Sequence, residues 1–182
     1  DFQPSSEPKT VDVLFAGNMG YPPNVEAAVF LETEVMPLVR KRIPEAKLML
    51  AGARPEQKVK DLAGELIEVT GWVDDIRDCY AKAKVFVAPM MIGTGLQNKL
   101  LEAMAMRIPC ITSTLANNAL KAKPDVEILI AKTADEYASQ IIRLLTNREK
   151  ADQIASAGHH LVTEHFSWEG ATKPLLEILS KN

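Results

Sequence analysis

The sequence predicts an α/β fold in which helices cover both faces of a doubly wound parallel sheet of about six strands. Short apolar runs such as residues 11–16, 47–51 and 85–87 alternate with segments whose apolar residues recur with a helical period. The first two runs each end at a glycine, Gly17 and Gly52. Short strands that are apolar throughout and separated by helices are typical of a parallel sheet buried on both faces.

The first half of the chain contains four predicted strands and the helices between them. Asn24 is predicted to cap the first helix, which Pro37 should kink or divide. A second helix is predicted over residues 55–63, with a proline in its first turn. Asp74 is predicted to cap a third helix that runs to Ala83. The four strands are predicted at residues 11–16, 47–51, 66–69 and 85–87.

The second half begins with a glycine-rich turn. Gly93 and Gly95 follow the fourth strand, and the next helix is predicted to open directly from this turn. Pro109 precedes the fifth strand, where it removes no bond from the centre of the sheet. The last two strands are predicted at residues 110–112 and 128–130, and the last helices near residues 133–146, 148–164 and 167–179.

The predicted topology places a ligand crevice at one edge of the sheet. Right-handed crossovers among six strands favour a Rossmann-type sheet with strand order 3-2-1-4-5-6. In such sheets the ligand binds beyond the carboxyl ends of the strands, where the strand order reverses, here between strands one and four. The glycine-bearing loops at residues 17–20 and 93–95 would therefore meet at one site.

A polar stripe is predicted on the helix that follows the glycine turn. Gly95, Asn98, Lys99 and Glu102 are spaced at i, i+3, i+4 and i+7, so they share one face. Free backbone N–H groups at the start of a helix suit a phosphate, and Glu102 interrupts an apolar run where an idle carboxylate would be costly. An anion site with a cation and a carboxylate behind it fits a sugar nucleotide. The alternative is that Lys99 and Glu102 form a surface ion pair and that the glycines only shape a turn.

Composition restricts the class of protein. The chain has 182 residues, 47% of them hydrophobic and 25% charged, which is ordinary for a single soluble domain. A net charge of −3 does not indicate the basic surface that binds nucleic acid. No apolar run approaches the ~20 residues that span a bilayer. Cys79 and Cys110 form no C-x-x-C pair, which indicates a reduced, cytosolic setting. Residues 1–10 read as a linker without an initiator Met, so we expect a piece of a longer protein.

These motifs resemble the nucleotide-sugar-binding C-terminal domain of GT-B glycosyltransferases of retaining family four. The resemblance covers almost the whole chain, and it implies that the sheet is one half of a GT-B fold, with residues 11–182 as the donor-binding domain. Within the family it is most similar to sugar transferases of bacterial exopolysaccharide and surface-polysaccharide pathways. The matching segments are residues 15–19, 69–75, 100–105 and 166–169, and those shared with the subgroup are residues 17–24 and 95–104.

The resemblance implies a hexosyltransferase. Such an enzyme moves a sugar, with retention, from a nucleoside-diphosphate sugar to a glycan or lipid-linked acceptor. Its N-terminal acceptor-binding domain is absent from this chain, which should therefore be inactive alone. The resemblance implies no metal or other cofactor, and nucleic acid is not expected as a partner. We expect a cytoplasmic location, with the missing half as the part that could reach the inner face of the membrane.

The resemblance also assigns roles to residues. Glu102 would accept hydrogen bonds from the ribose hydroxyls. Glu102 and Lys99, the nearby cation on the same helical face, are the two predicted catalytic residues. Backbone amides of Gly95 and Leu96 would meet the diphosphate, and the loop with Trp72 would border the nucleobase. The predicted donor-binding residues are Gly17, Asn18, Trp72, Val73, Thr94, Gly95, Leu96, Lys99 and Glu102.

The sequence departs from the family pattern at three positions. Thr94 stands where the family has the first Glu of its E-x7-E pattern, of which Glu102 is the second. Asn18 and Asn24 stand where many relatives carry an Arg and a Lys, and Lys99 is the nearby cation that could replace them. As alternatives, Asn18 and Asn24 are turn and cap residues, and Trp72 is a core or interface aromatic.

Two other functions use the same fold. One is a sugar-nucleotide epimerase of GT-B architecture, against which the lack of histidine and carboxylate pairs near the crevice argues. The other is a non-catalytic Rossmann module that binds a dinucleotide. No G-x-G-x-x-G follows the first strand, and Gly52 stands where an acidic residue would end the second. Titration with UDP, GDP, ADP and NAD would separate these classes.

Overall fold

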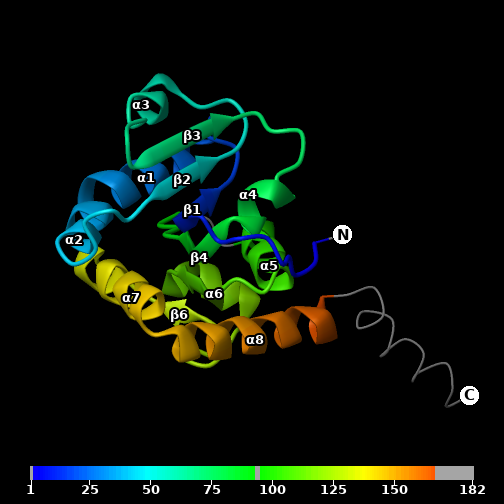
Figure 1. Ribbon diagram of the computed structural model, residues 1–182. Helices are drawn as coiled ribbons and strands as arrows, with labels where there is room; N and C mark the ends of the chain where they lie inside the picture. The colour runs from blue at the N-terminus through cyan, green and yellow to red at the C-terminus, as the bar shows by residue number, and fades with distance from the viewer. Residues whose placement is uncertain (1, 93–94, 167–182) are drawn as a thin grey trace, which may run out of the picture.

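The computed structural model describes residues 2–92 and 95–166 and contains one six-stranded sheet. All strand pairs are parallel, in the order β3-β2-β1-β4-β5-β6 (Figure 1), so the predicted topology is confirmed. Each predicted strand is present, with bounds that differ by a few residues at most. The strands are β1 (Val11–Ala16), β2 (Leu48–Ala51), β3 (Ile67–Gly71), β4 (Ala83–Ala88), β5 (Cys110–Thr112) and β6 (Leu129–Ile130).

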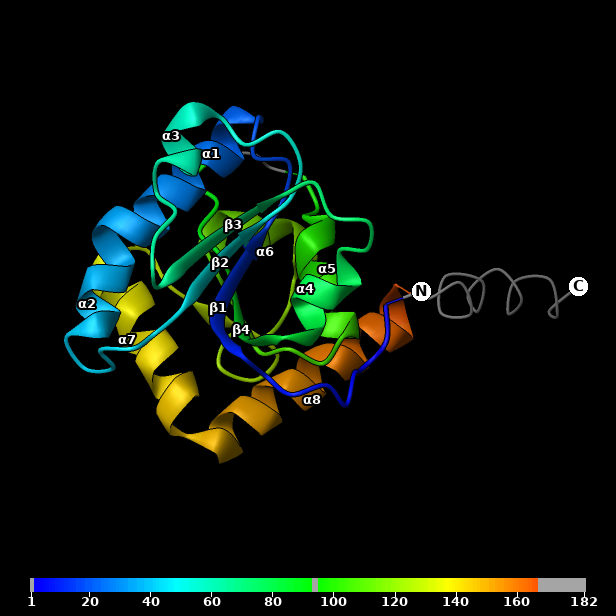
Figure 2. The ribbon, with the colours of Figure 1, turned by 45° about the horizontal axis from the view of Figure 1, so that its top comes forward.

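Helices cover both faces of this sheet (Figures 1 and 2). The helices α1, α2 and α7 pack together on one face, and α4, α5 and α8 lie on the other. The helices are α1 (Pro22–Phe30), a π-helical segment (Leu31–Val35), α2 (Met36–Arg40), α3 (Gln57–Lys60), α4 (Arg77–Ala81), α5 (Asn98–Ala105), α6 (Thr114–Leu120), α7 (Ala134–Thr146) and α8 (Arg148–His165).

The core lies between the sheet and these two helical layers. The side chains of β1, β2, β4 and β5 are almost all buried, which matches their mainly apolar sequences; the exceptions are Asp12 in β1 and Lys84 in β4. Phe15, Leu50 and Phe86 are fully buried, and each such side chain stabilises the fold by about 1.5–3 kcal/mol. The edge strand β3 is half-buried.

The first helical region differs from its prediction at Asn24. Tyr21 stands at the N-cap and α1 begins at Pro22, so Asn24 lies inside the first turn and is buried. The prediction that Asn24 caps the helix is wrong because the two prolines already suit the first helical positions, where an N–H has no partner to lose.

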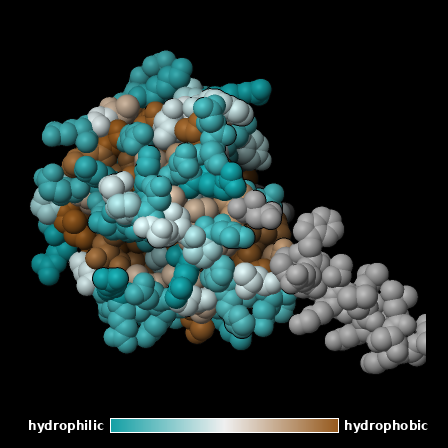
Figure 3. Space-filling model, turned by 45° about the vertical axis from the view of Figure 1, so that its right-hand side comes forward, coloured by the Kyte–Doolittle hydropathy of each residue, from teal (hydrophilic) through white to brown (hydrophobic). Residues whose placement is uncertain are grey.

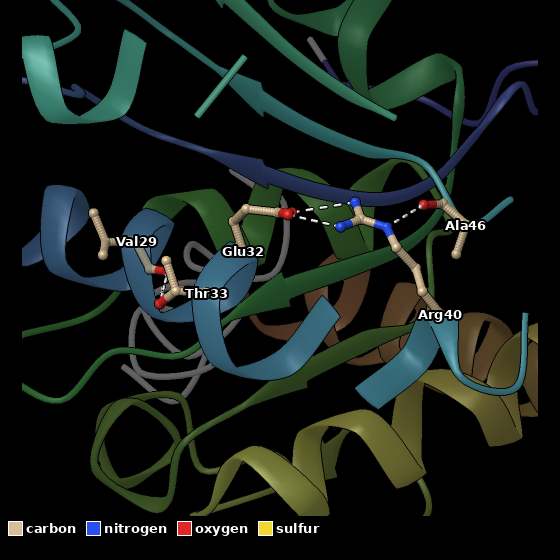
Figure 4. A network of polar contacts seen from close by, with 5 residues as sticks. All are labelled: Val29, Glu32, Thr33, Arg40 and Ala46. Carbon is tan, nitrogen blue, oxygen red and sulfur yellow. Dashed lines mark hydrogen bonds and ion pairs between the residues drawn. The ribbon is translucent and has the colours of Figure 1, made fainter. Parts of the chain in front are cut away.

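Pro37 divides the helix, as predicted. It lacks the N–H that would continue the α-helical pattern, and the chain passes through the π-helical segment before α2 begins. Arg40 of α2 binds back to the π-helical segment (Figure 4). Its guanidinium binds both oxygens of Glu32 in that segment at 2.6 and 3.2 Å, and its Nε donates to Ala46 O.

Two other helices are shorter than predicted. The segment predicted over residues 55–63 forms a helix at α3 alone, with Glu56 at its N-cap. Asp74 does not cap α4. Asp75 instead accepts from the backbone N–H of Arg77 and pairs with its guanidinium. The carboxylate that binds the start of this helix is therefore one residue later than predicted. The helix ends at Ala81, which leaves Ala83 as the first residue of β4.

The helix after the glycine turn also starts later than predicted. Gln97 is its N-cap and Asn98 its first residue, so Gly95 and Leu96 lie in the preceding loop. Gly93 and Thr94 are outside the described residues. The sequence analysis did not anticipate α6, which Ser113 caps by accepting from the N–H of Ala116.

The last helices agree with their predictions. Thr133 and Asn147 cap α7 and α8 through their side chains. The helix predicted near residues 167–179 lies outside the described residues. In the described part of the chain, no helix has both the length and the apolar character needed to cross a membrane. Hydrophilic side chains cover most of the face in Figure 3, with apolar patches between them.

Candidate functional site

A cavity of about 620 Å³ opens at the carboxyl ends of β1, β2 and β3. Its walls are the loops that follow these three strands, together with one face each of α4 and α5. This is the carboxyl edge of the sheet that the predicted topology assigned to the ligand. The prediction placed the crevice between strands one and four, whereas the described cavity lies over β1, β2 and β3, and α5 alone represents the segment that follows β4. The lining residues are Ala16, Gly17, Asn18, Gly52, Ala53, Arg54, Trp72, Val73, Asp74, Ile76, Tyr80, Lys99 and Glu102.

Glu102 is oriented by a buried tyrosine. The hydroxyl of Tyr80 in α4 donates to Glu102 Oε2 at 2.9 Å and lies 3.3 Å from the carbonyl oxygen of Lys99. Tyr80 is fully buried between the rings of Phe2 and Phe86. Burial, and then the charge of Glu102, raises the pKa of Tyr80 well above its usual value. The phenol is therefore a neutral donor that fixes the carboxylate.

Lys99 is the cation closest to this carboxylate in sequence. Its Nζ donates to Asn24 Oδ1 and lies 4.8 Å from the centroid of the Phe15 ring. Burial lowers the pKa of Lys99 to about 8, with Glu102 acting weakly in the opposite direction. Among the ion pairs of the described residues, none joins Lys99 to Glu102. The alternative of a surface ion pair between Lys99 and Glu102 is therefore wrong.

Glycines allow the first two loops of the cavity to touch. A Cβ on Gly52 would lie 1.9 Å from the carbonyl oxygen of Gly17, and Gly52 has a φ of +136°. No other residue type accepts both conditions without a shift of the backbone. Asn18 makes the turn that follows β1, since its Oδ1 accepts from the N–H of Gly20 at 3.0 Å. The prediction of a turn role for Asn18 is confirmed, and Asn18 also lines the cavity.

Arg54 is a second cation of the cavity that the sequence analysis missed. It follows Gly52 by two residues, has a φ of 56°, and its exposed side chain lines the cavity. Counting onward from the end of the second strand would have found it, because loops at that edge of the sheet converge. The side chain of Trp72 is 77% exposed at the same cavity, so the alternative of a core aromatic is wrong.

The structure brings together most of the predicted donor-binding residues. Those that line the cavity come from three segments of the chain. Gly95 and Leu96 do not line it, and both are exposed in the loop before α5. Thr94 lies outside the described residues. The predicted residues that line the cavity are Gly17, Asn18, Trp72, Val73, Lys99 and Glu102.

The other reactive side chains lie away from the cavity. Cys79 and Cys110 are buried free thiols, and burial raises the pKa of each. His159 lies against the end of α5, with Nδ1 3.0 Å from the carbonyl oxygen of Ala105. Within residues 2–92 and 95–166, no three His, Cys, Asp or Glu side chains gather in a way that could hold a metal ion.

Comparison with known proteins identifies one matching family. The family described as "Glycosyl transferases group 1" matches residues 10–147. Among curated proteins, the chain is 27% identical over 164 residues to the GDP-mannose-dependent alpha-(1-6)-phosphatidylinositol monomannoside mannosyltransferase of Mycobacterium tuberculosis. That alignment covers 79% of this chain and 42% of the relative, so the chain spans less than half of the relative's length.

Solved structures share the fold at low sequence identity. Anabaena HepE in complex with UDP and glucose superposes with a TM-score of 0.74 at 14% identity, covering 95% of this chain and 49% of HepE. The C-terminal domain of the glycosyl transferase group 1 protein LpcC from Francisella tularensis gives a TM-score of 0.74 at 19% identity. That match covers 92% of this chain and 96% of the LpcC domain. The fold is therefore that of one half of a GT-B glycosyltransferase.

Proposed function

Because this chain belongs to the glycosyl transferases group 1 family, we propose that it is the donor-binding domain of a retaining hexosyltransferase. The complete enzyme would transfer a sugar from a nucleoside-diphosphate sugar to a glycan or lipid-linked acceptor. The observation that carries the proposal is the cavity at the carboxyl edge of the sheet, which holds an oriented carboxylate and an ammonium from one helix.

The chemistry of the cavity matches the parts of a sugar nucleotide. Glu102 has one oxygen bound to Tyr80 and a second oxygen that can accept from the vicinal ribose hydroxyls. Lys99 and Arg54 offer positive charge for the diphosphate. Trp72 offers an exposed ring for the nucleobase. A cavity of about 620 Å³ is within the usual size of small-molecule sites.

Catalysis would be mainly electrostatic. As the bond between the sugar and the diphosphate breaks, negative charge develops on the leaving nucleoside diphosphate. The ammonium of Lys99, partly withdrawn from water, would stabilise that charge without reorganisation. Glu102 would hold the nucleoside so that the scissile bond lies at the mouth of the cavity. No metal is assigned a role.

The partners follow from the same proposal. A GT-B enzyme forms its reaction cleft between two halves, so an N-terminal acceptor-binding half would face this cavity. Two comparisons support a nucleotide-sugar donor. HepE has been solved with UDP and glucose, and the mycobacterial relative is named as GDP-mannose-dependent.

Calorimetric titration of this chain with UDP, GDP, ADP and NAD tests the proposal. We expect at least one nucleoside diphosphate to bind, and to bind more tightly than NAD. Preferential binding of NAD would favour the dinucleotide-binding alternative. If none of the three diphosphates bound at millimolar concentration, the proposal would be overturned.

A further inference from the structure

A buried asparagine holds the ammonium of Lys99. Asn24 lies in the first turn of α1, and its side chain is 5% exposed. Its Oδ1 accepts from Lys99 Nζ at 2.5 Å, and its Nδ2 donates to the carbonyl oxygen of Asn18 at 3.0 Å. The second bond fixes the orientation of the amide, because a carbonyl oxygen can only accept. Oδ1 is therefore turned toward Lys99.

Apolar and backbone groups also border the ammonium. Phe15 presents the face of its ring, and the sulfur of Met90 lies 3.8 Å from Nζ. Gly17 leaves the space that the pair occupies: a Cβ on Gly17 would lie 2.8 Å from Asn24 Nδ2 and 3.2 Å from Lys99 Nζ. The position of the charge is therefore set by α1 and β1, although Lys99 itself belongs to α5.

Among the residues that the structure describes, no carboxylate forms an ion pair with this ammonium. Glu102 lies on the same helix and is bound to Tyr80 of α4. Arg54 and Asp74 line the cavity from the loops after β2 and β3. Asn24 supplies an acceptor that carries no charge. An aspartate in its place would bring a negative charge against the ammonium and neutralise it.

We propose that Asn24 is a positioning residue: it holds the ammonium of Lys99 beside the loop after β1 as a neutral acceptor, so that the full positive charge is available to the donor diphosphate. This inference rests on the proposed function, in which Lys99 faces the diphosphate. It adds that the charge state and the position of Lys99 are controlled from α1.

The test compares Asn24→Ala and Asn24→Asp with the unmodified chain. The probes are UDP and uridine, titrated by calorimetry between pH 6.5 and 9.5, and the ratio of the two affinities isolates the diphosphate. In the unmodified chain this ratio should fall as the pH rises above about 8, because deprotonation of Lys99 removes its charge. Asn24→Ala should lower the ratio at pH 7 by roughly three- to thirty-fold, as expected for one misplaced charged hydrogen bond.

Asn24→Asp separates positioning from packing. It keeps the shape of the side chain but loses the donation to the carbonyl oxygen of Asn18, so its effect at a residue needed only for packing would be to weaken UDP and uridine binding alike. We expect the ratio at pH 7 to fall, because the carboxylate neutralises the ammonium. The alkaline decline should move to higher pH, because a neighbouring negative charge raises the pKa of Lys99. An unchanged ratio and pH profile in both variants would overturn the inference, as would an equal loss of uridine affinity in both.

Lys99→Met distinguishes this inference from the proposed function. It removes the charge while keeping the length of the side chain, and it should lower UDP affinity with little effect on uridine. If Lys99→Met leaves UDP affinity unchanged, the assignment of Lys99 to the diphosphate fails and the inference fails with it. If Lys99→Met weakens UDP and the Asn24 variants do not, the inference alone is overturned. Lys84→Met, which alters a lysine paired with Asp12 in the sheet, is the matched control.

Discussion

At the scale of the residue, the candidate site depends on side chains that are fixed before any ligand arrives. Glu102 and Lys99 come from the same helix, but each is held by a different element, Glu102 by Tyr80 of α4 and Lys99 by Asn24 of α1. Prior fixing of polar groups reduces the entropy that binding would otherwise cost. Substitutions at these residues should therefore change affinity more than stability.

Glu102→Ala should abolish most of the nucleoside affinity. In the proposed role, the substitution would remove two charge-assisted hydrogen bonds to the ribose, each contributing about 1.5–3 kcal/mol, so affinity should fall by one to several orders of magnitude. Calorimetry with UDP, GDP and their nucleosides measures this. Glu149→Ala, at an exposed position in the first turn of α8, is the matched control. Unfolding of the Glu102 variant would instead show that Glu102 is structural, and unchanged affinity would refute the ribose role.

Tyr80→Phe should weaken the nucleoside several-fold while the aromatic packing persists. The substitution removes the hydroxyl that orients Glu102 and keeps the ring between Phe2 and Phe86. Uridine and UDP should lose affinity by the same factor, since the effect acts through the ribose and not the diphosphate. A loss confined to UDP would contradict this explanation.

At the scale of the element, the loops after β1 and β2 are in contact because glycine is present at both. Gly52 combines a left-handed φ with a close approach to the backbone of Gly17. A Cβ on Gly64, by contrast, would lie 4.0 Å from its nearest neighbouring atom, the carbonyl oxygen of Leu62. Glycine is therefore required at position 52, whereas position 64 has room for a larger side chain.

Gly52→Ala should destabilise the fold by at least about 2 kcal/mol, because strain at a left-handed position adds to a backbone clash. Gly64→Ala should change the free energy of unfolding little, or stabilise slightly by restricting the unfolded chain. Urea unfolding followed by circular dichroism measures both. Equal effects of the two substitutions would show that the contact between the loops does not determine stability.

At the scale of the whole molecule, the described residues form one parallel sheet covered by helices, with a cavity at the carboxyl edge of the sheet. The alignment with the mycobacterial relative covers 42% of that protein. Transfer in the proposed enzyme requires an acceptor and the exclusion of water from the reacting atoms. In the proposed enzyme, both would come from the second half.

This chain alone should bind a nucleoside diphosphate and transfer no sugar. Incubation with radiolabelled UDP-glucose or GDP-mannose and lipid or glycan acceptors, followed by chromatography of the products, measures transfer. A protein that joins this domain to an N-terminal half should be active under the same conditions. Transfer by this chain alone at a comparable rate would refute the proposed division of labour between the two halves.

The sequence by itself determined the parallel sheet, its strand order and the edge at which the cavity opens. These follow from local patterns: apolar runs of strand length, helical periodicity, glycines at strand ends, and the handedness of crossovers. The same local patterns placed Lys99 and Glu102 on one helical face. Element bounds at α3, α4 and α5 were less accurate, because capping depends on which side chain reaches a free N–H.

The tertiary structure alone decided which side chains meet. Asn24 precedes Lys99 by 75 residues, and Tyr80 precedes Glu102 by 22. No periodicity relates residues at such separations, since their contact depends on how helices from three crossovers pack around one strand edge. For the same reason the contact between Asn24 and Lys99 was not predicted. The partner of a buried amide is the group that the folded structure places beside it. That partner is defined only once the sheet and its helices have packed.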